Sequence, residues 1–197
     1  LRNSCRQEFG ISDTDILLLQ VGSGFSIKGV DRSLTAMASL PQDLLKTTHL
    51  IIIGRDEPGS YQIQAGRLGL GNRVTFLKSR DDIPRFLQAA DLLLHPSYKE
   101  SAGMVILEAI VAGLPVLTTA SCGYAFHVQD ADAGLVIEEP YTQQMLNAAL
   151  LGMLQNDDRI RWKENGLRYG ITGDFYAMPE RVAGLIMEAT RGNTHDS

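Results

Sequence analysis

Two glutamates flank a turn of small residues near the middle of the chain. Glu100 precedes Ala102 and Gly103, and Glu108 lies eight residues further on, inside an apolar segment typical of a helix. A helix that begins near Ala102 leaves its first backbone N–H groups without intrahelical partners, so partial positive charge gathers at the turn, where a diphosphate would fit. Glu100 could accept hydrogen bonds from sugar hydroxyls, and Glu108 could bind two neighbouring hydroxyls of a ribose. The pattern therefore indicates a nucleotide-sugar site.

The amides expected at the phosphates are those of Ala102, Gly103 and Met104. A purely structural interpretation would make Glu100 a helix-start carboxylate and Glu108 an exposed helix residue. We favour binding because residues 105–112 are so apolar that the helix is expected to be mostly buried. An ionised side chain in such a helix needs a polar partner or a cleft.

A second candidate lies in the glycine-rich segment between Gly22 and Gly29. It is not a dinucleotide-binding fingerprint, because Ile27 occupies the third glycine position, and it is not a Walker A loop, because Val30 follows Gly29. A glycine-rich turn after a strand is often only a tight turn. Lys28 favours phosphate binding here, since a lysine at the start of a helix can neutralise a phosphate as a mobile point charge.

Three further basic residues follow expected strands. Arg55 is a weaker phosphate candidate, and Arg80 could lie across a base ring, while Asp81 or Asp82 is expected to cap the next helix. His95 precedes a proline at the tip of a strand, and we expect it only to line the site.

Short β-type runs alternate with helical spacing, which predicts an α/β fold: a Rossmann-like parallel sheet with helices on both faces, ending in several helices. Ligands then belong beyond the carboxyl ends of the strands. The expected strands are 16–21, 49–53, 74–77, 91–94, 116–119 and 134–137. The expected helices are 30–40, 60–68, 83–89, 103–112, 142–155, 159–169 and 178–190.

Composition narrows the class of protein. The chain has 197 residues, is 44% hydrophobic and carries a net charge of −5, which favours one globular domain and argues against a nucleic-acid-coating surface. Two cysteines favour a reducing, cytoplasmic compartment, and no apolar run approaches the roughly 20 residues that span a bilayer. The four histidines share no metal-ligand spacing, and Asp13 and Asp15 precede a strand, away from the expected ligand edge, so no metal site is expected.

Taken in order, several motifs resemble the retaining glycosyltransferases of family 4. They are Gly22 with Lys28-Gly29, then Arg80, His95-Pro96-Ser97, Glu100 and Glu108 with seven residues between them, and Ala112-Gly113-Leu114-Pro115-Val116. Members of this family have a two-lobed GT-B fold, and the resemblance covers only the C-terminal, donor-binding lobe. It implies that residues 1–197 form a single nucleotide-sugar-binding domain and that the N-terminal acceptor domain is absent. The chain also begins without methionine, in what resembles the middle of a helix, as a fragment would.

The resemblance implies roles for individual residues. Glu100 would contact sugar hydroxyls, Lys28 would hold the leaving phosphate, and these two are the expected catalytic residues. Glu108 would bind the ribose, and Arg80 with its backbone the uracil. Residues that depart from the family pattern lie just before Lys28 and after the second strand, where Arg55 could compensate in part; they are Ile27, Glu57, Gly59 and Ser60.

The residues around these motifs resemble those of family members that transfer glucose from UDP-glucose to an inner-core heptose of lipopolysaccharide. The implied reaction is a hexosyl transfer with retention and without a bound metal or other cofactor, since the UDP-hexose is a substrate. The acceptor would bind through the missing lobe, so the isolated chain is expected to be inactive. Contact with the inner face of the bacterial inner membrane is compatible with this interpretation. Two alternatives remain open: a UDP-sugar epimerase of the same fold, and a nucleotide-binding module without catalysis.

Overall fold

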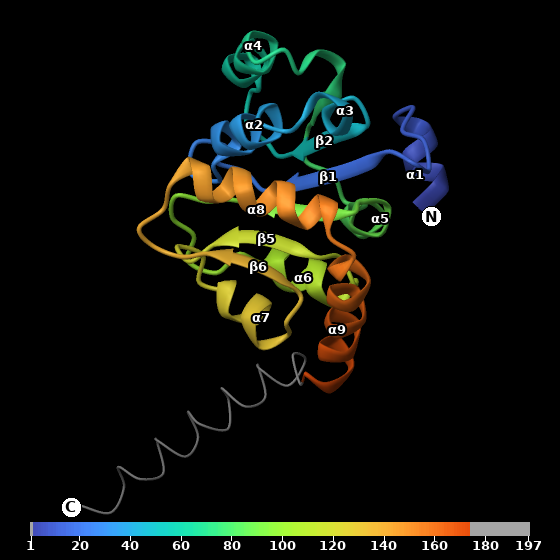
Figure 1. Ribbon diagram of the computed structural model, residues 1–197, viewed down its shortest axis with the longest axis vertical. Coiled ribbons are helices and arrows are strands. Elements are labelled where there is room, and N and C mark those ends of the chain that lie inside the picture. The colour runs from blue at the N-terminus through green and yellow to red at the C-terminus, as the bar shows by residue number, and fades with distance from the viewer. Residues whose placement is uncertain (1, 174–197) are drawn as a thin grey trace, which may run out of the picture.

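Six parallel strands form the centre of the structure, a computed structural model that describes residues 2–173 (Figure 1). Their order across the sheet is β3-β2-β1-β4-β5-β6, and every neighbouring pair is parallel. The strands are β1 (Ile16–Val21), β2 (Thr48–Ile53), β3 (Val74–Leu77), β4 (Leu92–His95), β5 (Val116–Thr119) and β6 (Gly134–Ile137). The prediction of a six-stranded parallel α/β sheet is confirmed.

The central strands are nearly continuous apolar runs because helices cover both of their faces. Leu17, Leu18 and Leu19 in β1 are all fully buried, although their side chains alternate between the two faces. Leu17 and Leu19 belong to one buried cluster, and Leu18 belongs to the other. The sheet therefore separates two cores.

Helices cover the sheet in two layers, as Figure 1 shows. One layer contains α1 (Arg2–Glu8), α5 (Ile83–Ala89), α6 (Met104–Val111) and α7 (Ala125–Asp130). The other contains α2 (Val30–Ala38), α3 (Gln42–Leu45), α4 (Gly59–Arg67) and α8 (Gln143–Gln155), while α9 (Asp158–Thr172) packs against α6. A short 3-10 turn, Gly71–Arg73, precedes β3. No helix within residues 2–173 is long and apolar enough to cross a membrane.

Three helical features differ from the expectation. Two short helices, α3 and α7, were not expected, and α6 begins at Met104, two residues later than Ala102. The later start follows from Gly103, which occupies the N-cap position with a left-handed φ of 87°. The helix expected over 178–190 lies outside the described residues.

The order of the strands creates a topological switch point at the centre of the sheet. The chain passes from β1 outward to β2 and β3, and then returns to place β4 on the other side of β1. The connections that leave β1 and β4 therefore diverge, and a crevice between them is the usual ligand site of such sheets. The residues after β1 and after β4 meet at this point.

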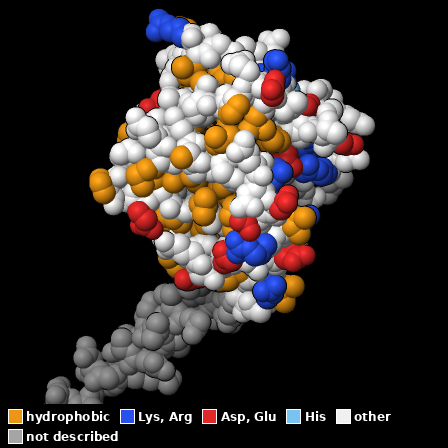
Figure 2. All heavy atoms as spheres, viewed as in Figure 1, with side chains coloured by type: hydrophobic (Ala, Val, Ile, Leu, Met, Phe, Trp, Pro, Cys, Tyr) orange, Lys and Arg blue, Asp and Glu red, His pale blue; other side chains and the backbone are white. Residues whose placement is uncertain are grey.

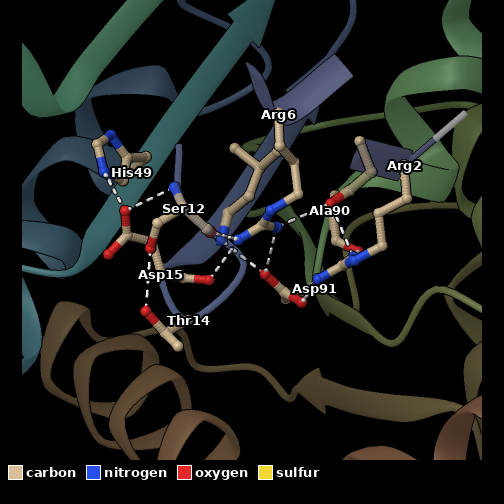
Figure 3. A network of polar contacts seen from close by, with 10 residues as sticks. Arg2, Arg6, Ser12, Thr14, Asp15, His49, Ala90 and Asp91 are labelled. Carbon is tan, nitrogen blue, oxygen red and sulfur yellow. Dashed lines mark hydrogen bonds and ion pairs between the residues drawn. The ribbon is translucent and has the colours of Figure 1, made fainter. Parts of the chain in front are cut away.

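A buried arginine organises the opposite, amino-terminal edge of the sheet (Figure 3). Arg6 is fully buried, and its guanidinium donates to the carbonyl oxygens of Ser12 and Ala89 at 2.7 and 3.0 Å and to the Asp91 carboxylate at 3.2 Å. The Asp15 carboxylate accepts from the Ser12 backbone N–H at 3.0 Å. Asp15 therefore has a structural role, as its position before β1 indicates.

Candidate functional site

The centre of the candidate site is an ion pair between Lys28, which follows β1, and Glu100, which follows β4. Their side chains are only 17% and 15% exposed. Burial lowers the pKa of Lys28 below its usual value, because removal from water disfavours the charged amine. An open pocket of about 470 Å³ lies beside the pair and is also lined by Ser26, Tyr98 and Lys99. The two residues expected to be catalytic thus lie together.

The glycine-rich loop shapes the lysine side of the site. Gly22 has a φ of 143°, and a Cβ added there would lie 3.1 Å from Cε of Lys28, so the lysine stem runs directly over this glycine. The Gln20 side-chain amide donates to the Lys28 carbonyl oxygen at 2.8 Å. Asp56, just after β2, accepts from the backbone N–H groups of Gly24 and Phe25 at 2.7 and 3.2 Å. Its position after a strand is the one signal in the sequence for this carboxylate, whose role was not predicted.

The turn before α6 forms the glutamate side. Among residues 2–173, no acceptor pairs with the backbone N–H groups of Ala102, Gly103 and Met104. A Cβ on Gly103 would lie 3.3 Å from Cγ of Glu100, so the glutamate stem packs on the same turn. Open amides, one ammonium and one carboxylate therefore share a small region. This combination can stabilise a phosphate charge and orient a hydroxyl.

Glu108 lies on an exposed face of α6, so the expectation that its helix encloses it is wrong. The helix buries Ile106, Ala109 and Ile110 against the sheet, but Met104, one turn before Glu108, is 54% exposed. The sequence did not distinguish the buried face of this helix from its exposed face, because the exposed face is itself partly apolar. The carboxylate remains open to a ligand.

Arg55 and Arg80 lie after neighbouring strands but stand apart from the central pair. The Arg55 side chain is exposed, and its backbone N–H donates to the Ser23 hydroxyl at 3.2 Å. Arg80 forms two hydrogen bonds with Asp82, at 2.7 and 2.9 Å, and these hold the pKa of that carboxyl at about 2. Asp82 occupies the N-cap position of α5, so the expected position is confirmed, but its side chain makes no capping bond and the expected capping interaction is absent among the described residues. Within the described part of the chain, no hydrogen bond or ion pair joins either arginine to Lys28 or Glu100.

His95 ends β4 and lies under the ion pair. Its side chain is 1% exposed, and its Nε2 lies 3.8 Å from Oε2 of Glu100. Neither ring nitrogen has a hydrogen-bond partner within residues 2–173. Burial and the nearby Lys28 charge lower the pKa of His95 to about 3, so the imidazole is neutral at physiological pH.

We expect the His95 imidazole to show no protonation between pH 4.5 and 9 in an NMR titration of its ring protons. Because its pKa is lowered in the folded state, the unfolded chain binds more protons between about pH 3 and 6.5. Folding stability should therefore fall as pH drops through this range, and less so in His95→Gln. A midpoint near 6.5 for His95 in the folded protein would contradict this account.

Gly29 lies where the backbones of the two loops are close together. Its φ is 68°, and an added Cβ would lie 2.1 Å from the Pro96 carbonyl oxygen. We expect Gly29→Ala to destabilise the fold by about 2 kcal/mol or more, because strain and a backbone clash add. Gly59→Ala is the matched control, since a Cβ there meets nothing within 4 Å. Urea unfolding of both variants tests this, and equal stabilities would show that the loops can separate at no cost.

A model of the family described as "Glycosyl transferases group 1" matches residues 2–169. The chain belongs to this glycosyltransferase family. The family resemblance seen in the motifs is therefore confirmed. Within residues 2–173 no three His, Cys, Asp or Glu side chains gather as a metal site would require.

Relatives of this glycosyltransferase chain include two named bacterial glycosyltransferases. It is 50% identical over 94% of its length to the lipopolysaccharide glucosyltransferase WaaG of Escherichia coli K12, and covers 50% of that protein. It is 32% identical over 74% of its length to a D-inositol 3-phosphate glycosyltransferase of Mycobacteroides abscessus, covering 33% of it. The chain thus spans about half the length, or less, of these relatives.

Solved structures agree with the fold of this glycosyltransferase chain. The crystal structure of WaaG matches with a TM-score of 0.89 and 49% identity over 94% of this chain and 50% of that one. Anabaena Alr3699/HepE, crystallised with UDP and glucose, matches with a TM-score of 0.81 and 25% identity over 94% of this chain and 51% of that one. The chain therefore has the architecture of one half of these GT-B proteins.

Proposed function

We propose that this chain is the donor-binding half of a retaining glycosyltransferase that transfers glucose from UDP-glucose to the lipopolysaccharide core. The observation that carries the proposal is the Lys28–Glu100 ion pair beside the open amides of the α6 turn. The similarity to the Escherichia coli lipopolysaccharide glucosyltransferase supports both the donor and the acceptor class.

In the proposed complex the diphosphate lies against the amides of Ala102, Gly103 and Met104. Lys28 adds a positive charge on the other side, so the charge that develops on the leaving UDP meets donors already in place. Glu100 accepts hydrogen bonds from the hexose hydroxyls and fixes the sugar for attack. We propose that the transfer needs no bound metal ion, because the amides and Lys28 supply the positive charge.

The nucleoside end of the donor extends toward β3 in this proposal. Glu108, exposed on α6, takes the two ribose hydroxyls, and Arg80 with its backbone borders the uracil. Arg55, after β2, is a weaker contact for the phosphates. Gly22 contributes by leaving space for the Lys28 stem.

The acceptor proposed is a heptose of the inner core, bound by an N-terminal lobe that lies outside this chain. The enzyme would work on the cytoplasmic side of the inner membrane and touch its surface peripherally. The relatives are named as transferases, which favours transfer over the UDP-sugar epimerase considered from sequence. Isolated from the acceptor lobe, the chain would act as a nucleotide-sugar-binding module.

A donor screen by thermal shift and calorimetry tests this function. UDP-glucose at about 100 times its Kd should raise Tm by about 5–10 °C, and GDP-mannose should not. UDP-galactose and UDP-N-acetylglucosamine, which share the nucleotide, serve to define the hexose. The 197-residue chain should bind UDP-glucose and transfer no glucose on its own. Failure of every UDP derivative to bind, or efficient transfer by this chain alone, would refute the proposed division between lobes.

A further inference from the structure

Arg32 of α2 is held between two aromatic rings next to the site. Its guanidinium carbon lies 3.5 Å from the ring centroid of Tyr98 and 3.7 Å from that of Tyr141. Both faces of the planar cation are thus covered, which is a favourable arrangement for a guanidinium and one that an ammonium cannot reproduce. The two rings restrict the orientation of the guanidinium, so its N–H groups point in fixed directions.

The edge of the guanidinium binds the segment that leads to Glu100. Nη1 of Arg32 donates to the carbonyl oxygens of Ser97 and Pro96 at 3.1 and 3.3 Å. The Ser97 oxygen also accepts from the hydroxyls of Thr119 and Ser121 at 2.8 and 2.7 Å. This one carbonyl is therefore anchored to α2 on one side and to the end of β5 on the other.

The same segment contacts the lysine loop directly. The backbone N–H of Tyr98 donates to the Ile27 carbonyl oxygen at 2.8 Å, and the Tyr98 hydroxyl donates to Asp31 at 2.6 Å. Ile27 precedes Lys28 in the chain, and Tyr98 lies two residues before Glu100. The relative placement of the two charged residues therefore depends on how residues 96–98 are held.

We propose that Arg32 is a positioning residue for glycosyl transfer: by clamping residues 96–98 it sets where Glu100 stands relative to Lys28 and the α6 amides. The inference rests on the proposed function for its catalytic meaning. Arg32 donates hydrogen bonds to the backbone of residues 96–97 and forms no hydrogen bond or ion pair with Lys28 or Glu100 within the described residues. The side chain acts through the loop and not on the donor.

Three variants of the 197-residue chain separate this role from general stabilisation. Arg32→Lys keeps the positive charge but loses the planar guanidinium that stacks between the rings. Tyr141→Leu removes one of the two rings. Tyr141→Phe keeps that ring and removes only its hydroxyl, which donates to Gln143. The readouts are hydrogen exchange at the backbone amides of Tyr98 and Glu100, both hydrogen-bonded across the loop, and calorimetric affinity for UDP-glucose.

Arg32→Lys and Tyr141→Leu should speed exchange at these two amides at least tenfold and weaken UDP-glucose binding by about tenfold, since small displacements in a site are costly. Tyr141→Phe should match the wild type in both. Unchanged exchange, or an equal rise at Leu34 inside α2, would overturn the positioning role. If wild-type protein binds no UDP derivative, the proposed function fails, and the exchange data alone decide whether Arg32 holds the loop.

Discussion

Replacing Lys28 with methionine is expected to weaken the binding of both UDP and UDP-glucose by about a hundredfold, which corresponds to about 2.7 kcal/mol. The substitution removes the cation that faces the diphosphate. It also leaves Glu100, only 15% exposed, as an unpaired carboxylate that repels the phosphates. Calorimetry on the 197-residue chain measures both affinities.

Glu100→Gln should have a different signature. With the carboxylate gone, Lys28 is free for the phosphates, so UDP should bind with unchanged or higher affinity. UDP-glucose should lose about tenfold relative to UDP, because the charged acceptor of the hexose hydroxyls is missing. The ratio of the two affinities therefore isolates the sugar contact.

Lys99→Met is the matched control, because Lys99 lines the same pocket but is exposed. An exposed lysine contributes little when screened by solvent, so its loss should change either affinity by less than threefold. Equal losses for Lys28 and Lys99 would mean that only general charge attracts the donor. Full affinity in Lys28→Met would remove the ion pair from the site.

Arg6→Met is expected to reduce the free energy of unfolding by about 3–5 kcal/mol, the usual cost of breaking a buried charge network. The side chain is fully buried, and it joins the chain before β1 to the start of β4 (Figure 3). Without it, the carbonyl of Ala89 loses a buried donor, and Asp91 keeps only Arg2 as an ion-pair partner among the described residues.

Arg2→Gln provides the comparison for this prediction. Arg2 contacts the same Asp91 at 2.8 Å, but its side chain is 40% exposed, so water can replace part of what is lost. Its effect should be less than half of that of Arg6→Met in urea unfolding. The account of the amino-terminal edge fails if the two substitutions cost the same.

The sheet was predictable from sequence because its four central strands are largely buried on both faces and its half-buried edge strands, β3 and β6, are also mainly apolar. The apolar runs at 16–21, 74–77, 116–119 and 134–137 match the observed strands residue for residue. The short helix α7 was missed, because six residues carry too little periodicity and its first residues follow a polar loop. Helix starts shifted where a glycine, such as Gly103, caps the helix with a left-handed backbone.

The site was predictable where its residues follow strands. Lys28 and Glu100 could be placed together because the carboxyl ends of β1 and β4 share one edge of the sheet. The exposure of Glu108 was predicted wrongly, since composition says how apolar a helix is but not which face is covered. Asp56 had only its position after β2 as a signal and Arg32 had none, because the partners of both residues lie in loops more than thirty residues away along the chain.

The switch in strand order has a consequence for how a ligand stabilises the molecule. Strands β1 and β4 are neighbours in the sheet, but about seventy residues of chain separate Lys28 from Glu100. The contact between these two strands is therefore the boundary between two halves of the sheet. A nucleotide bound to both residues therefore connects the two halves of the sheet. Its binding should slow local opening on both sides together, so that the two halves respond as one cooperative unit.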